Sequence, residues 1–199
     1  MQRWVAADVP ITGPLATWRG SEGDRTTWTQ STVAAQPNVA AIEGAQAVTF
    51  DGGDFMASTF VPGASFTAYY VFRIDSIGAV SRILSHLGGI VLAVNSEGVL
   101  RMGGSNTGIS GGTVIPSRWY VFAITFTGTT ATINFNDALT TSTALTRGAN
   151  PGYSSLGAAP DGSTPLFGAL RDVIFYPTVH NTADRENMVA ALRSWYTAA

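Results

Sequence analysis

The sequence predicts an all-β fold, a sandwich of two antiparallel sheets with one short helix at the C-terminal end. Three observations predict it. A strand pattern beside a glycine turn occurs at Ala47–Phe55 and again at Leu166–Tyr176. Strand-like alternation fills much of the chain between them, and one helical pattern follows the second segment. Strands distant in sequence are therefore expected to close the sheets.

The composition is that of one well-packed domain. The 199 residues are 45% hydrophobic and 12% charged, with a net charge of −2 and no cysteine. Such a chain has enough apolar material for a full core and too little charge for disorder. The weak negative charge predicts no nucleic-acid partner, and the lack of cysteine excludes disulfides. No stretch approaches the ~18 apolar residues of a membrane-spanning helix, which predicts no membrane insertion.

Residues 1–46 show neither a helical nor a strand period, and we expect them to form an irregular N-terminal strap packed on a body formed by residues 47–199. Trp4, Trp18 and Trp28 are spread among Gly, Pro, Thr and Ser. Large aromatic side chains usually bury their area, which favours packing of all three rings against the body. Exposed platforms for stacking sugars are the alternative interpretation.

The body begins with two strand patterns. Val48 and Phe50 alternate with a polar residue before the turn Asp51–Asp54. In Phe66–Ile74 apolar residues occupy every second position, which is typical of a half-buried strand.

The sequence in the middle of the body predicts two hairpins separated by loops. Short strands are expected at 82–86, 90–94 and 99–102, the last two joined by the turn Asn95-Ser96-Glu97-Gly98. The glycine-rich segment 103–112 is predicted to be a flexible loop. A second hairpin joins strands at 119–126 and 131–135, and residues 137–165 are expected to be rich in loops.

The last strand, at 169–176, leads into the predicted helix. Asn181 or Thr182 is suited to cap its N-terminus. Residues at helical spacing then form one apolar stripe, for which we expect docking against the sandwich. The stripe consists of Met188, Val189, Leu192, Trp195 and Tyr196.

With these elements placed, the chain resembles the concanavalin A-like lectin/glucanase superfamily, in particular the laminin-G-like jelly-roll domains of the stand-alone bacterial and bacteriophage type. TFDGGDF resembles the first core strand and its turn. SRWYVFAITFTGTTATINFND resembles the central hairpin, although Asn136-Asp137 stands where the family has an Asn-Gly-type turn. LFGALRDVIFY resembles the closing strand, and TWRGSEGDRTTWTQSTVAAQPNV resembles the segment before the first strand.

The sequence favours a protein that is not an enzyme. Glycan-cleaving enzymes of the superfamily carry Glu-x-Asp-x-x-Glu on one strand, which supplies the two carboxyl groups of hydrolysis. This chain has glutamate only at positions 22, 43, 97 and 186, and no two share a predicted strand. The two histidines, His86 and His180, form no metal-ligand pattern, and Gly-x-Ser-x-Gly is absent.

Binding is the better supported chemistry. The resemblance implies glycan binding through loops at one rim or on the concave sheet, often with calcium as cofactor. Calcium prefers several oxygen ligands, which turn residues with carboxylate or amide side chains can supply. Asp51 and Asp54 rank first as metal ligands, because they flank two glycines that leave room for an ion. Local turn formation is the other interpretation of such residues. The candidate carbohydrate or calcium ligands are Asp51, Asp54, Asn106, Asn136, Asp137 and Asp161.

Three hypotheses follow about function. The chain opens without a signal-peptide pattern, so we expect it to be made in the cytoplasm, where a glycan-binding domain meets little glycan. A phage virion accessory protein, such as a capsid decoration or tail adhesion module, resolves this, with other virion proteins or copies of itself as partners and glycans as ligands. The alternatives are a free, extracellular calcium-dependent lectin and, ranked last, a glycoside hydrolase.

Overall fold

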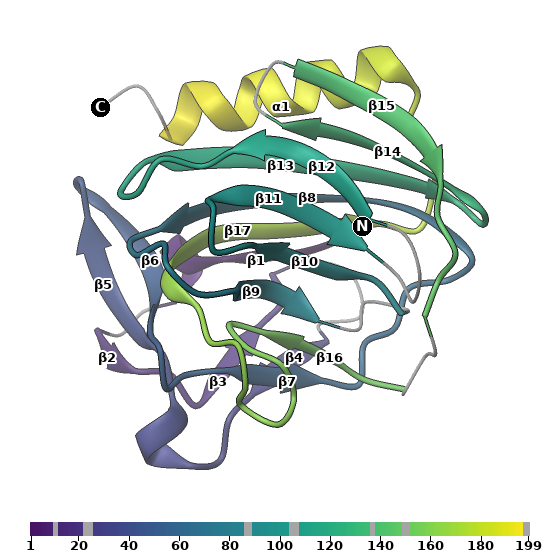
Figure 1. Ribbon diagram of the computed structural model, residues 1–199. Coiled ribbons are helices and arrows are strands. Elements are labelled where there is room, and N and C mark those ends of the chain that lie inside the picture. The colour runs from purple at the N-terminus through teal and green to yellow at the C-terminus, as the bar shows by residue number, and fades with distance from the viewer. Residues whose placement is uncertain are drawn as a thin grey trace.

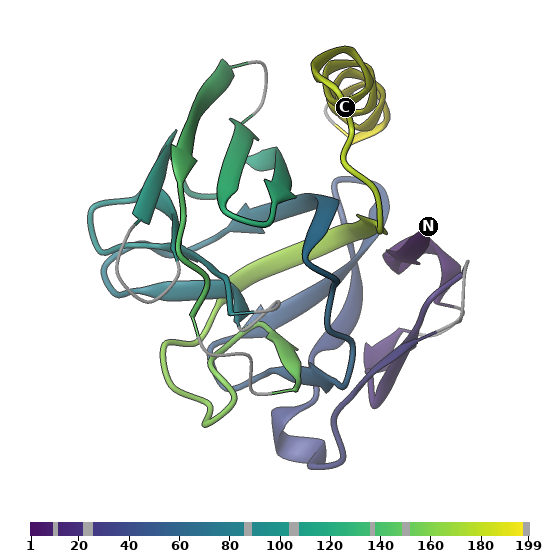
Figure 2. The same cartoon turned by 90° about the vertical axis from the view of Figure 1, so that its right-hand side faces the viewer.

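The computed structural model describes residues 1–9, 12–21, 26–85, 89–103, 108–135, 138–148 and 152–196, apart from the side chains of 138–143. Two antiparallel sheets face each other, and helix α1 (Thr182–Tyr196) lies on the outer side of one of them (Figures 1 and 2). The predicted all-β sandwich with a C-terminal helix is confirmed. Two single-turn 3-10 helices, Ala6–Asp8 and Val33–Ala35, interrupt the early strands.

The first sheet, which carries α1, has nine strands within the described ranges. Their order is β15-β14-β13-β8-β17-β6-β5-β2, and β1 pairs with β17 beside this path. The bounds are β1 (Gln2–Val5), β2 (Gly13–Pro14), β5 (Asn38–Ile42), β6 (Ala45–Asp51), β8 (Ser65–Ile74), β13 (Trp119–Thr127), β14 (Thr130–Phe135), β15 (Ala138–Ala144) and β17 (Phe167–Tyr176).

The second sheet has eight strands over the same described ranges, in the order β12-β11-β10-β9-β16-β7-β4-β3. Neighbouring strands in both sheets are often far apart in sequence, as the closing of a jelly roll requires. The bounds are β3 (Thr17–Arg19), β4 (Thr27–Thr29), β7 (Met56–Ser58), β9 (Ser81–Ser85), β10 (Val91–Val94), β11 (Val99–Gly103), β12 (Gly108–Thr113) and β16 (Ser154–Leu156).

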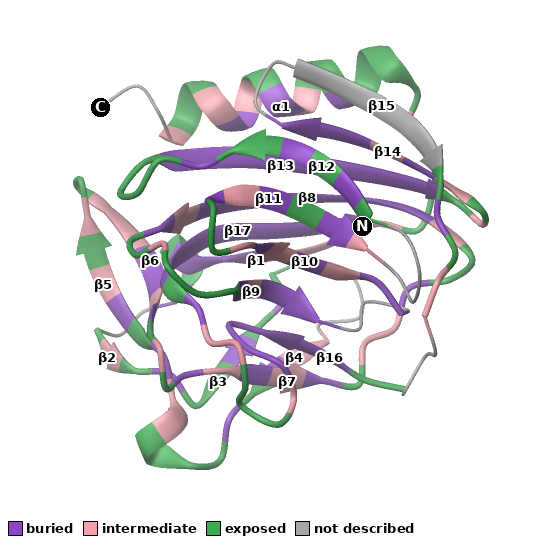
Figure 3. Cartoon of the chain, viewed as in Figure 1, coloured by how far each residue is buried: buried purple, intermediate pink, exposed green. Residues whose placement is uncertain are grey.

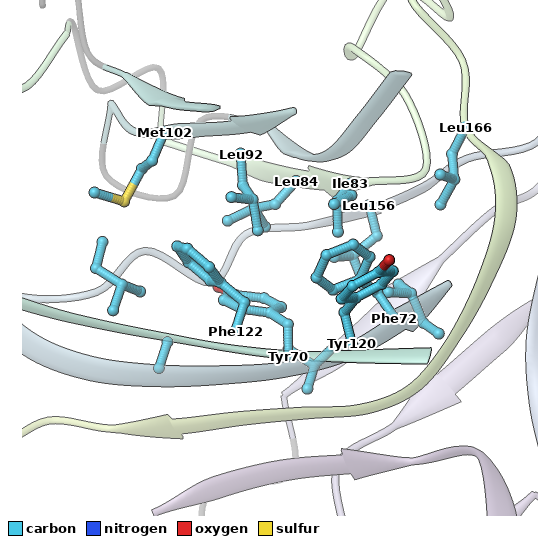
Figure 4. Close-up of a cluster of buried hydrophobic side chains, with 14 of the residues drawn as sticks. Tyr70, Phe72, Ile83, Leu84, Leu92, Met102, Tyr120, Phe122, Leu156 and Leu166 are labelled. Atoms are coloured by element: carbon cyan, nitrogen blue, oxygen red, sulfur yellow. The ribbon is translucent and has the colours of Figure 1, made fainter. Parts of the chain in front are cut away.

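The main core lies between the sheets. Successive residues of a strand point to opposite faces, so every second residue of β8 and β13 points to the second sheet. Tyr70 pairs with Phe122 and Phe72 with Tyr120 across these two strands. Their rings meet aliphatic side chains of the second sheet, all 2% exposed or less (Figure 4). These include Ile83, Leu84, Leu92, Met102 and Leu156.

A second hydrophobic cluster lies under α1, on the other face of the first sheet. The alternation in 66–74 predicts a half-buried strand, but the structure buries both faces of β8 (Figure 3). Val189 and Leu192 of α1 cover that face together with Met188 and Tyr196. Because α1 docks on this face of the sheet, the face is buried and not exposed to solvent as the alternation predicts. The strand residues beneath include Tyr69, Val71, Trp119, Val121 and Ala123.

Buried polar contacts hold α1 at both ends. Arg185, near its start, donates through Nε to the Asn134 side chain at 3.0 Å. At its end the guanidinium carbon of Arg171 lies 3.9 Å from the Trp119 ring centroid, and Nη1 donates to the Tyr196 carbonyl at 3.1 Å. A cation held on an aromatic face and on a helix's last carbonyls stabilises that end.

The first 46 residues are more regular than the sequence indicates. They contribute β1, β2, β3, β4 and β5 to the two sheets, so the expected irregular strap consists largely of sandwich strands. Its indoles are buried as predicted: Trp4 is 0% exposed and Trp18 and Trp28 are 1% exposed. Trp4 donates through Nε1 to the Thr26 carbonyl at 2.8 Å. Exposed sugar platforms at these three positions are therefore ruled out.

Two predicted loops also contain strands. The segment 103–112 includes β12, and 137–165 includes β15 and β16. Both segments contain many glycines and polar residues but few large apolar ones, so an apolar alternation is hard to recognise. β12 and β15 are the edge strands of their sheets, which need less apolar alternation than central ones.

Candidate functional site

Several loops converge at one end of the sandwich, where the yellow-green segment before β17 lies (Figure 1). We call this end the rim and define it as residues 51–54, 75–80, 114–118 and 157–167. Main-chain hydrogen bonds tie its parts together. The amide of Ser117 donates to the Ile74 carbonyl at 2.7 Å, and the amide of Arg82 to the Thr164 carbonyl at 3.0 Å.

An exposed aromatic ring lies on the rim at Phe167. The residue is 45% exposed, although it begins an otherwise buried strand. Its ring lies over Gly52, where a Cβ atom would come 2.0 Å from the ring's Cζ. Gly52 also has a φ of 95°, which favours glycine. The backbone of the Asp51–Asp54 turn thus supports one side of an open phenyl ring.

Two carboxylates flank this ring, one in the neighbouring strand β6 and one directly after strand β8. Asp51 is the direct register partner of Phe167 across β6 and β17. On the other side, the amide of Asp75 donates to the Phe167 carbonyl at 2.8 Å. Since adjacent strands are about 4.8 Å apart, both side chains start close beside the ring. We call Phe167, Asp51 and Asp75 the Phe167 platform.

Asp75 is held in place by its neighbours. Its Oδ1 accepts hydrogen bonds from Nε of Arg73 and from the Ser117 hydroxyl at 3.2 Å. Arg73 also lies 3.4 Å from the Glu43 carboxylate. A carboxylate fixed through one oxygen can present the other to a ligand.

The Asp51–Asp54 turn is built by its own carboxylates. Oδ1 of Asp51 accepts from the Gly53 amide at 3.0 Å, and Oδ2 of Asp54 accepts from the Asp51 amide at 3.0 Å. Asp54 is only 3% exposed. Burial, together with the neighbouring Asp51 carboxyl, raises the pKa of Asp54 to about 6. Of the two predicted ligands, Asp51 faces solvent and Asp54 stabilises the turn.

Asp161 lies in the loop 157–166 at the same end. Its Oδ1 accepts from the amide of Ser163 at 2.9 Å and from the hydroxyl at 2.6 Å. These hydrogen bonds lower the pKa of Asp161. The carboxylate therefore forms a local turn. The other predicted ligands, Asn106, Asn136 and Asp137, lie outside the described residues, as does His86.

The Asp51–Asp54 turn leaves few oxygens of the two carboxylates free for a calcium ion. Calcium takes about six to eight oxygen ligands, and one Asp54 oxygen is already used by the turn. Within the described ranges, no three His, Cys, Asp or Glu side chains gather as a metal site would require.

Sequence reasoning missed Phe167 and Asp75. The alternation of 167–176 does place Phe167 opposite the core-facing positions, but a strand covered on both faces makes that signal ambiguous. Asp75 becomes recognisable only from the pairing of β8 with β17, which spans residues distant in sequence.

The described chain also holds no helix that meets the length and hydropathy of a membrane span.

Two facing sheets, crossed connections and a rim of loops define a lectin-like jelly roll. The family model of the concanavalin A-like lectin/glucanases superfamily matches residues 43–184. The chain therefore belongs to this superfamily. No curated protein sequence matches it significantly.

Solved structures share the fold at low sequence identity. Trypanosoma rangeli sialidase is 12% identical with a TM-score of 0.69, over 96% of this chain and 32% of the sialidase. The botulinum neurotoxin serotype G binding domain is 11% identical with a TM-score of 0.69, over 97% of this chain and 51% of that one. This chain thus spans about a third of the sialidase and half of the toxin structure.

One similar structure is a domain of the same size. Domain 4 of AbnA, a GH43 extracellular arabinanase from Geobacillus stearothermophilus, was solved in complex with arabinotriose. It is 12% identical with a TM-score of 0.69, over 94% of this chain and 97% of that domain. At this identity the similarity establishes the fold alone.

Proposed function

We propose that the chain is a non-catalytic carbohydrate-binding domain that holds a glycan at the Phe167 platform. The observation that carries the proposal is an exposed ring, 45% accessible, with a carboxylate beside it on each side, Asp51 in β6 and Asp75 directly after β8. The C–H face of a sugar ring packs on the electron-rich face of an aromatic ring. Carboxylate oxygens then accept hydrogen bonds from the sugar hydroxyls. The arabinotriose complex of AbnA domain 4 and the family membership support this ligand class.

The absence of catalysis is part of the proposal. Glycoside hydrolysis needs a general acid with a raised pKa that can reach the leaving oxygen. Asp54 has the raised pKa, but it is 3% exposed and accepts the Asp51 amide hydrogen. Asp75 is engaged with Arg73 and Ser117. Incubation with a panel of polysaccharides should release no new reducing ends, and release that survives purification would contradict the proposal.

Substitution of the ring tests the site. Binding to a glycan array identifies a ligand, and isothermal titration then measures its Kd. We expect Phe167→Ala to weaken binding at least tenfold, a loss of about 1.4 kcal/mol, because the stacking surface disappears. Phe167→Tyr should retain most of the affinity. Tyr153→Ala, which removes another exposed aromatic side chain, is the matched control. Equal affinity of Phe167→Ala and the unaltered chain would overturn the assignment of the site.

The calcium-dependent alternative predicts a different result in the same titration. Binding that disappears in EDTA and returns with calcium would support a lectin that uses a bound ion. We expect EDTA to have little effect, since the described Asp51–Asp54 pair supplies few free oxygens.

The sequence suggests that this domain is part of a phage particle, and this location stays a prediction. Its test is biochemical: an antibody against the chain should label purified virions, and binding to other virion proteins or to itself should resist washing. Absence of the chain from purified particles would leave the free extracellular lectin.

A further inference from the structure

The most exposed aromatic side chain in the described part of the molecule is not on the rim. Val33 aside, Trp195 has the largest exposed fraction among the hydrophobic side chains, 60%. The helical stripe predicts that it docks with the rest of α1, but the structure leaves it largely in solvent, with the guanidinium carbon of Arg3 5.8 Å from its ring centroid. Val189 and Leu192 face the sheet, whereas Trp195 follows Leu192 by three residues and projects toward the side of the helix.

Trp195 ends a groove along that side of the helix. The groove has a volume of about 440 Å³, within the range of small-molecule sites. Asp184, Met188, Ala191 and Trp195 are spaced by three or four residues and therefore form one row on the helix. Asn187 and His180 complete the lining. We call these six residues the α1 groove.

His180 is fixed at one end of the groove. Its Nδ1 lies 2.7 Å from the Tyr69 hydroxyl, and its ring centroid lies 4.3 Å from that of Tyr176. Its amide donates to the Thr67 hydroxyl at 2.9 Å. Burial raises the pKa of Tyr69, so the hydroxyl keeps its proton and can donate to Nδ1. The Nε2 atom of the neutral imidazole is then left to donate to a sugar hydroxyl or to accept from it, according to the tautomer.

Two further polar side chains of the groove are available to a ligand. Asp184 uses its amide to bind Asn181, and within the described structure neither its carboxylate nor the Asn187 side-chain amide makes a hydrogen bond. Acceptors, donors and an aromatic face thus lie along one row. The lining contains one carboxylate, and the Arg3 guanidinium lies beside the Trp195 ring, so opposite charges balance at the groove and favour a neutral ligand.

We propose that the α1 groove is a second saccharide-binding site, separate from the rim, which stacks a neutral sugar on Trp195 and binds its hydroxyls through Asp184, Asn187 and His180. The ligand class rests on the proposed function, whereas the site does not. With a site on the rim and another on the helix, one molecule holds two glycan segments. Two linked weak sites bind a polymeric glycan more tightly than either alone.

The distribution of tryptophan provides a direct measurement. Of the five tryptophans, four are at most 8% exposed, so acrylamide quenching of fluorescence reports mainly on Trp195. The probes are arabinotriose, maltotriose and cellotriose at millimolar concentration. We expect at least one of them to reduce the quenching constant about twofold, in a saturable manner. The four buried indoles are those of Trp4, Trp18, Trp28 and Trp119.

Variants that keep Trp195 assign the protection to the groove. Asp184→Asn and Asn187→Ala should each raise the saccharide concentration needed for half-protection at least fivefold. Glu186→Gln, exposed on α1 but outside the groove, is the matched control. Phe167→Ala should leave protection unchanged, which separates this site from the rim.

The outcomes distinguish the two sites. Trisaccharide binding that depends on Phe167 but leaves Trp195 quenching unchanged overturns the groove and preserves the proposed function. Protection of Trp195 without Phe167-dependent binding supports the groove and overturns the rim. The groove proposal is wrong if none of the three sugars protects Trp195 from quenching. It is also wrong if the sugar protects Trp195 at the same concentration in Asp184→Asn, in Asn187→Ala and in the unaltered chain.

Discussion

At the scale of the residue, the Asp54 carboxylate lies in a buried environment that disfavours its negative charge. It is 3% exposed, next to Asp51, and its pKa is raised from 3.8 to about 6. The folded state therefore binds more protons than the unfolded state between these two values, and its stability falls as pH rises through them. Within the described structure, the side chain accepts the Asp51 amide hydrogen, for which an amide oxygen is an equal acceptor.

We therefore expect Asp54→Asn to stabilise the protein above pH 6. The gain should be about 1 kcal/mol, less than the whole shift because Asp51 faces water, which screens the pair. Well below pH 3.8, the pKa of the unfolded carboxyl, the group is protonated in both states, and the gain should vanish. Urea unfolding at pH 7.5 and at about pH 2.5 measures the difference. A variant less stable than the unaltered chain at pH 7.5 would show that the charge is needed.

The candidate site was only partly predictable at this scale. Local composition reveals the Asp51–Asp54 turn, because glycine and aspartate both favour turn conformations. Phe167 and Asp75 become neighbours of that turn only through sheet pairing. The same logic misassigned Trp195, since helical spacing identifies a stripe but not the width of the sheet beneath it.

At the scale of the element, α1 was the most predictable part of the chain because its signals are local. Asn181 caps it, with Oδ1 accepting the Asp184 amide hydrogen at 2.9 Å. Asp184 lies in its first turn and Arg193 in its last, where the helix dipole favours each charge. The edge strands β12 and β15 lack such local signals, and their pairing alone defines them.

The cap gives a prediction for the helix. Asn181→Ala leaves the Asp184 amide without its acceptor and should cost about 1 kcal/mol of the free energy of unfolding. Because α1 covers Tyr69 and Trp119, the near-ultraviolet circular dichroism should also weaken. Ser194→Ala, exposed near the other end of α1, is the control and should change stability by less than about 0.5 kcal/mol. Equal losses in both variants would contradict a specific capping role.

At the scale of the whole molecule, the first 46 residues decide how the sandwich is completed. β1 pairs with the second half of β17, from Asp172 to Phe175, while β6 pairs with its first half. The rings of Trp4 and Trp28 meet edge to face, with centroids 5.8 Å apart. The sequence could not show this, because strands of two to five residues are too short for a clear period and many of their partners lie far along the chain.

This arrangement predicts the behaviour of a chain limited to residues 43–199, which contains the whole region matched by the family model. It lacks β1, β2, β3, β4 and β5, so β6, β7 and the second half of β17 each lose one of their neighbouring strands. It also loses the three buried indoles of the early strands, and replacing one large buried aromatic already costs about 3–5 kcal/mol. Marginal stability cannot absorb several such losses. We expect the shortened chain to bind a hydrophobic dye and to unfold without a cooperative transition. The control is Val33→Ser in the full chain, at a position that is 72% exposed, and it should melt at the same temperature as the unaltered protein. A cooperative transition of the shortened chain near the melting temperature of the full one would show instead that residues 43–199 fold as an independent domain and that the early strands are an addition to it.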